Sequence, residues 1–114
     1  MRKIAVALLL GMLAYWPVVA AAADVSIEEL AVGMADTSED HAALANYFRA
    51  QAATARQQAT SHEGMAQRYG RHAKLVQKGM MQQHCKKIAE NEKSSAAEYE
   101  ALAKLHEEAA KSSK

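Results

Sequence analysis

The chain has 114 residues, which is the size of one small domain. Its 14 Lys and Arg residues nearly balance 13 Asp and Glu residues, so no strong field exists to recruit nucleic acid or an anionic membrane. A single cysteine excludes an intramolecular disulfide.

The first 23 residues have the pattern of a cleaved secretory signal peptide. Arg2 and Lys3 precede the apolar run 4–19, and "VVAAAAD" offers small residues for a cut after Ala23. The apolar run is shorter than the roughly 20 residues of a membrane-spanning helix. We therefore expect an exported chain, periplasmic or secreted, with no membrane attachment after cleavage. Its net charge would be 12 − 13 = −1.

Residues 24–114 are predicted to form one small all-α domain. They are rich in the good helix formers Ala, Gln, Glu, Lys and Met, and β-branched runs typical of strands are absent after residue 32. Ser26 is suited to cap a short first helix that Gly33 would end. Two long helices are then expected at about 39–69 and 80–110.

Local signals support these two long helices. Thr37 or Ser38 can cap the first one, and Gly70 and Gly79 bracket the expected turn. Opposite charges spaced four apart favour a solvated face on the second helix. These pairs are Lys86–Glu90, Glu100–Lys104 and Glu107–Lys111.

Each long helix carries a stripe of residues spaced by three or four, and an antiparallel hairpin would place the two stripes against each other. The first stripe is His41, Ala45, Phe48, Ala52, Ala55, Ala59, His62, Ala66 and Tyr69. The second is Met81, Cys85, Ile88, Glu92, Ser95, Tyr99, Leu102, His106 and Ala109. Facing residues then have numbers that sum to 147, as in Phe48 with Tyr99, Ala59 with Ile88, and Ala45 with Leu102.

The predicted seam between the helices is thin, because alanine dominates the first stripe. A hairpin of this size with so few large apolar residues is marginally stable alone. We therefore expect a homodimer in which two hairpins form a four-helix bundle.

The same register predicts two groups of metal-ligating side chains. The group near the turn combines thiol, thioether and imidazole, which suit Cu(I) and also Zn²⁺. Its members are His62, His84, Cys85, Met81, Met80 and Met65. A second, weaker group at the open end holds only His41 and His106, and His72 receives no role.

These patterns predict an exported helical protein that binds copper or zinc for storage, delivery or resistance, without an organic cofactor. The alternative is a metal-independent periplasmic interaction module, chaperone-like or structural. A third possibility is a disulfide between the Cys85 residues of two subunits. An enzyme is not expected, because His84 and Cys85 point about 100° apart on a helix and no third catalytic residue is visible.

Overall fold

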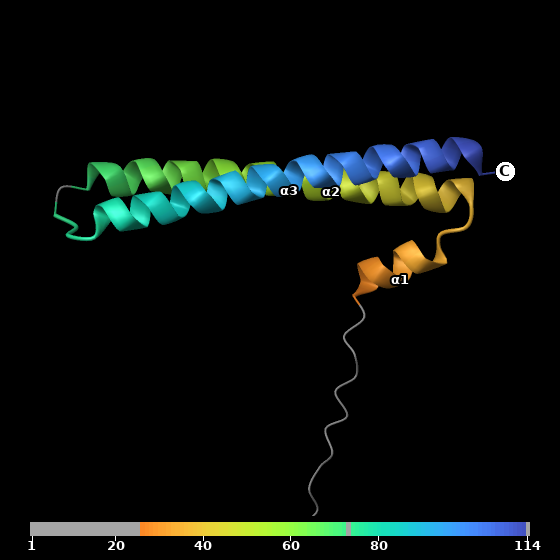
Figure 1. Cartoon of the computed structure of the whole chain (residues 1–114), viewed down its shortest axis with the longest axis horizontal. Coiled ribbons are helices and arrows are strands. Elements are labelled where there is room, and N and C mark those ends of the chain that lie inside the picture. The colour runs from red at the N-terminus through yellow and green to blue at the C-terminus, as the bar shows by residue number, and fades with distance from the viewer. Residues whose placement is uncertain (1–25, 73, 114) are drawn as a thin grey trace, which may run out of the picture.

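The computed structural model describes residues 26–72 and 74–113, and every regular element within them is a helix. The prediction of an all-α chain is confirmed for this part of the sequence. The predicted signal peptide, residues 1–23, lies outside the described residues. The elements in chain order are α1 (Ile27–Met34), α2 (Ser38–Arg71) and α3 (Lys78–Ser112) (Figure 1).

Side-chain caps fix where α1 and α2 begin. The Ser26 hydroxyl accepts a hydrogen bond from the Glu29 backbone N–H at 3.1 Å. Thr37, rather than Ser38, caps α2 in a reciprocal capping box with Asp40. Hydrogen bonds from the side chain and backbone of Thr37 lower the pKa of Asp40 from its ordinary value. Unlike these two helices, α3 follows Gln77, which makes no side-chain cap.

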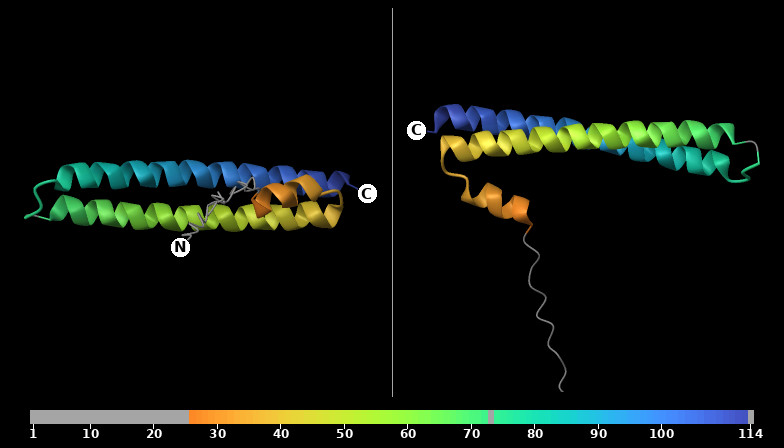
Figure 2. Two further views of the ribbon diagram at one scale, coloured as in Figure 1. Left: turned by 90° about the horizontal axis from the view of Figure 1, so that it is seen from below. Right: turned by 180° about the vertical axis from the view of Figure 1, so that it is seen from behind.

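The two long helices lie side by side over their whole length and run in opposite directions (Figures 1 and 2). Alanines repeat every seven residues along the seam, and each is at most 2% exposed. They are Ala45, Ala52, Ala59 and Ala66 on α2, and Ala89, Ala96 and Ala103 on α3. Such small side chains let two helix axes approach closely, although they bury little apolar area.

Larger buried side chains gather near the open end of the seam. Leu44 and Phe48 are each 7% exposed and pack with Ala103. Tyr99 covers this cluster, with its ring centroid 6.2 Å from that of Phe48. The predicted facing of Phe48 and Tyr99 is thus an observed contact.

On α3, every second position of the expected stripe is replaced in the seam by the residue that follows it in the sequence. The expected residues Ile88 and Leu102 are each 39% exposed, and Ser95 is exposed as well. The following residues, Ala89, Ala96 and Ala103, are buried instead. Their small size suits a close seam, and the bulkier side chains are displaced to its flank. The expected pairs Ala59–Ile88 and Ala45–Leu102 are therefore wrong.

Candidate functional site

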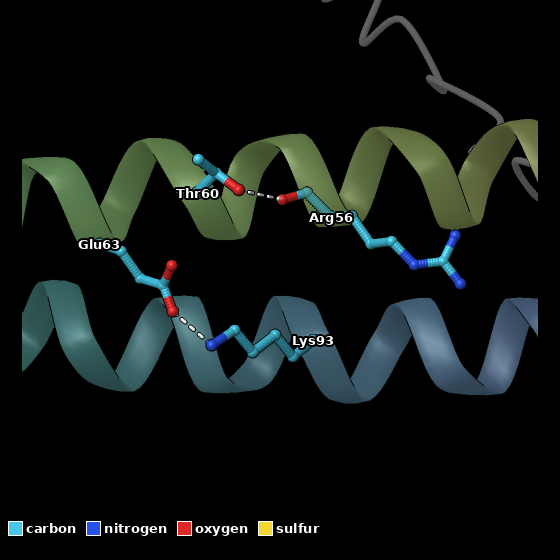
Figure 3. Close-up of polar contacts among 4 residues, drawn as sticks. All are labelled: Arg56, Thr60, Glu63 and Lys93. Atoms are coloured by element: carbon cyan, nitrogen blue, oxygen red, sulfur yellow. Dashed lines mark hydrogen bonds and ion pairs between the residues drawn. The ribbon is translucent and has the colours of Figure 1, made fainter.

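One flank of the seam is lined by charges that pair between the helices. Arg56 contacts Glu100 at 2.9 Å, and Arg49 with Glu107 and Glu63 with Lys93 form ion pairs one heptad to either side. Figure 3 shows Glu63 reaching across to Lys93. The side-chain hydrogen bond from Arg56 lowers the pKa of Glu100. We call this flank the charged edge.

The opposite flank carries no charged residue at the positions that line it. On α2 and α3 these positions immediately precede the buried seam alanines, whereas the paired charges immediately follow seam residues. On a helix, such neighbours project to opposite sides of the seam. We call this flank the uncharged edge; it comprises Leu44, Gln51, Gln58 and Met65 of α2 and Met81, Ile88, Ser95, Leu102 and Ala109 of α3.

Two surface hollows open along the uncharged edge. One, of about 430 Å³, is lined on α3 by Ser95, Tyr99 and Leu102, and on its outer side by Asn91, Ser94 and the charged Glu98. The other, of about 920 Å³, lies between α1 and α2 and is lined in part by Leu44 and Tyr47. The edge therefore presents depressions as well as exposed Ile88 and Leu102 side chains.

His41 and His106 meet at the open end of the seam, as the register predicts. Their Nδ1 atoms are 3.0 Å apart and their ring centroids are 5.3 Å apart. The difference, 5.3 − 3.0 = 2.3 Å, is about twice the distance from an imidazole centroid to its own nitrogen. The two nitrogens therefore lie close to the line that joins the centroids. The contact is head-on, with one Nδ1–H donating to the lone pair of the other Nδ1.

The surroundings of this pair hold the rings in place. Phe48 lies 13° from parallel with the His106 ring, at a centroid distance of 5.5 Å. About one helical turn beyond the pair, the Ser38 hydroxyl donates to the Ala110 carbonyl at 2.6 Å and ties the helix ends together. Burial, and then the neighbouring His41, lower the pKa of His106. The lowered pKa favours the uncharged form of the His106 ring, which has a lone pair on one nitrogen.

The six residues of the predicted turn-end metal group have different environments. Cys85 is buried with a free thiol, and His62 is half-buried, whereas His84 and Met80 are exposed. Met65 and Met81 are half-buried on the uncharged edge. Within residues 26–72 and 74–113, no three His, Cys, Asp or Glu side chains are placed to hold one metal ion. The structure thus does not gather His62, His84 and Cys85 into a three-ligand site.

His62 nevertheless has an unusual environment. Among the described residues, its Nδ1 is the one buried side-chain nitrogen or oxygen with no hydrogen-bond partner. The contacts His41–His106 and Phe48–Tyr99 both join residues whose numbers sum to 147. The predicted register pairs His62 with Cys85 by the same sum, but the Nδ1 of His62 makes no hydrogen bond to this thiol.

The charged edge was not anticipated from the sequence. Glu100 and Glu107 were assigned to pairs within the second helix, with Lys104 and Lys111, but they reach across to Arg56 and Arg49. The signal that could have found this edge is the seven-residue spacing of Arg49, Arg56 and Glu63.

Comparisons with protein-family models, with curated proteins and with solved structures found no match to this chain. None of the helices in the described part of the sequence is both long enough and apolar enough to cross a membrane.

Proposed function

We propose that the protein is a helical interaction module that works by pairing through its uncharged edge with a second copy of itself. The observation that carries this proposal is the separation of charge between the two flanks of one seam. Paired charges fill one flank, while the positions that line the other are uncharged and include the exposed Ile88 and Leu102, with Glu98 at the outer border of its hollow. Two such edges can meet without burying an unpaired charge.

The dimensions of this face suit a dimer. Helix α3 has 35 residues, and a helix of that length spans about 50 Å. Two adjacent helices, each about 10 Å wide, present a face of roughly 1,000 Å², which is near the 800 Å² or so that each partner buries in a standard interface. Two hairpins joined face to face would form a four-helix bundle.

The need for such pairing follows from the thin seam. Seven of the eleven buried apolar residues on α2 and α3 are the seam alanines, and an eighth is Ala55. An alanine contributes much less buried area than a leucine. Burying Ile88 and Leu102 against a partner would add larger apolar side chains to this core.

The experiment is sedimentation equilibrium of the purified chain over a range of protein concentrations, for wild type and Leu102→Glu. We expect a wild-type dimer and a monomeric variant, since the new carboxylate would be buried at the interface without a partner. Ala101→Glu is the matched control, because Ala101 is the preceding residue and is exposed away from the edge.

Three results would contradict the proposal. One is a wild-type chain that stays monomeric at every concentration. Another is a Leu102→Glu variant that dimerises as strongly as wild type. The third is equal weakening by Ala101→Glu. Far-UV circular dichroism of each variant checks that a change in association does not arise from unfolding.

Export remains part of the proposed function, with the action in the periplasm or outside the cell. The sequence of residues 1–23 supports this proposal. Mass spectrometry of the chain recovered from a bacterial periplasmic fraction should give a mature N-terminus at Asp24. An intact N-terminus in the cytosolic fraction alone would contradict export.

Soft-metal binding at the turn end is the second candidate function. It is favoured by the buried, unpartnered Nδ1 of His62 and by the buried Cys85 thiol, which the predicted register pairs with His62. The two groups supply imidazole and thiolate, which suit Cu(I) or Zn²⁺. Competitive titration of the reduced chain with Cu(I) should show weaker binding in His62→Ala and in Cys85→Ala. Equal affinity in all three proteins would exclude this site.

The same Cys85 variant addresses a disulfide between subunits. A thiol-sensitive dimer on a non-reducing gel that disappears in Cys85→Ala would support the bond. A dimer that persists in this variant under reducing conditions would instead support pairing through the uncharged edge.

A further inference from the structure

The head-on histidine pair at the open end joins titratable side chains from two different helices. His41 comes from the first turn of α2 and His106 from near the end of α3, 65 residues apart in the sequence. Their nitrogens face each other along one line, and Phe48 supports one of the rings. This arrangement is built by the fold and not by local sequence.

A neutral imidazole pair in this geometry holds one proton between its two Nδ1 nitrogens. One Nδ1 holds the proton and the other accepts it, so each ring is a donor on one nitrogen and an acceptor on the other. If the proton of the donor ring moves to its Nε2, both Nδ1 lone pairs point at the space between the rings. No net proton is then released, because the ring only changes tautomer.

We propose that His41 and His106 form a two-coordinate site for a monovalent soft metal ion, Cu(I) or Ag(I), held in line between the two Nδ1 atoms. Ions of this class accept two donors arranged along a line, and imidazole is a good ligand for copper. Zn²⁺ prefers four donors in a tetrahedron, which a head-on pair does not offer. The geometry therefore selects the monovalent ion.

The required movement is small. Two metal–nitrogen bonds of about 2.0 Å in line span about 4 Å, so the nitrogens must separate from their present 3.0 Å by about 1 Å. Both residues lie near helix ends, and rotation of the two side chains can provide this distance while the Ser38–Ala110 hydrogen bond keeps the helix ends together.

This site is independent of the proposed dimer and of the turn-end metal candidate. It lies on the seam and not on the uncharged edge, and it uses neither Cys85 nor His62. Loss of binding in one place therefore leaves the other proposals unaffected. A bound ion would also join the two helix ends that the chain does not connect.

The test is an anaerobic titration of the purified chain with Cu(I) against a competing colorimetric chelator, in a Cys85→Ser background. We expect one Cu(I) per chain. His41→Gln and His106→Gln should each lower its affinity by more than about 100-fold, because even losing an outer partner of a metal ligand costs about 10–100-fold. His84→Gln is the matched control, since His84 is an exposed histidine outside the pair.

Two wild-type measurements keep the proposal testable if a variant fails to fold. X-ray absorption of the Cu(I) complex in the Cys85→Ser background should show two nitrogen neighbours in line. Nitrogen NMR with Ag(I) should shift Nδ1 of His41 and His106 while leaving His84 unchanged. The proposal is overturned if both glutamine variants bind as tightly as their parent, if the ion has sulfur or four neighbours, or if His84 shifts instead.

Discussion

The two ends of the helix pair are built differently, and the end without a covalent connection has the richer packing. At the open end, Leu44 and Phe48 are buried against Ala103 and a capping box starts α2. At the turn end, Gln77 offers no side-chain cap to α3, and the Nδ1 of His62 lacks a partner. A short connecting loop keeps two helix ends together at a small cost in conformational entropy, so the unconnected ends need stronger side-chain contacts.

Gly70 at the turn end illustrates the difference in packing between the two ends. A Cβ placed on Gly70 would lie 2.5 Å from Nε2 of Gln82. The absent side chain lets Gln82 pack where the open end uses Phe48 and Tyr99. We therefore expect backbone amides of the turn-end half to exchange with solvent faster than those of the open-end half. Uniform hydrogen exchange along α2 and α3 would contradict this difference between the two ends.

The largest effect is expected from removing the aromatic side chain of the open end. Phe48→Ala should destabilise the fold by about 3 kcal/mol or more, because a buried Phe is replaced by a cavity. Met65→Ala at the turn end should cost less, since Met65 is only half-buried. Urea unfolding followed by circular dichroism measures both. A larger loss in Met65→Ala would contradict the ranking of the two ends.

A smaller change in stability is expected from removing the cap of α2 or adding one to α3. Thr37→Ala should destabilise by about 1 kcal/mol, because the capping box at the start of α2 is lost. Gln77→Asp should stabilise by a similar amount if the new carboxylate caps α3. Thermal unfolding of the two variants tests whether α3 lacks only a cap. No gain from Gln77→Asp would show that its backbone does not permit one.

The open end should also confer a dependence on pH. The folded pKa of His106 is lowered, so the unfolded chain binds this proton more tightly. Its contribution to stability is complete above the unfolded histidine pKa of about 6.5 and should decline as pH falls below that value. His106→Gln should flatten the change in melting temperature between about pH 7.5 and 5.5. His84→Gln should not.

Two carboxyl groups lie next to the histidine pair and are the other groups there whose titration could change stability with pH. Glu107 next to His106 is engaged by Arg49, and Asp40 next to His41 is held ionised by Thr37. Carboxyl side chains ordinarily titrate at lower pH than histidines. An unchanged pH profile in His106→Gln would therefore exclude the histidine as its source.

The smallest effect belongs to the charged edge, midway between the two ends. Glu100→Gln should cost no more than about 1 kcal/mol, because the Arg56–Glu100 pair is exposed and screened by solvent. Unfolding at low and high salt should show the difference shrinking as salt is added. A loss that grows with salt would mean that Glu100 acts through packing instead of charge.

Much of this structure follows from simple periodicity. The α2 stripe is predictable because His41, Phe48 and His62 alternate with alanines at spacings of three and four, which fits one helix face. The open-end contacts of His41 with His106 and Phe48 with Tyr99 followed from the same register.

The rest needed information that one helix does not carry. On α3, two phases of the three-four spacing share Cys85, Glu92, Tyr99 and His106, and only close packing against α2 selects the alanines over the bulkier neighbours. The spacing alone fits Ile88 and Leu102 as well as their neighbours, whereas the close approach of the helix axes buries the smaller Ala89 and Ala103. The turn-end metal group is not assembled because its members differ in burial: Cys85 is buried, whereas His84 is exposed.

The order of charges along the charged edge has a consequence for how the helices find their alignment. A seam of alanines repeated every seven residues looks the same after sliding one helix past the other by one repeat. The pairs Arg49–Glu107, Arg56–Glu100 and Glu63–Lys93 do not. Sliding one way would set Arg56 against Lys93, and sliding the other way would set Glu63 against Glu100. The reversed polarity of the third pair therefore penalises both shifts and gives a repetitive seam a single stagger.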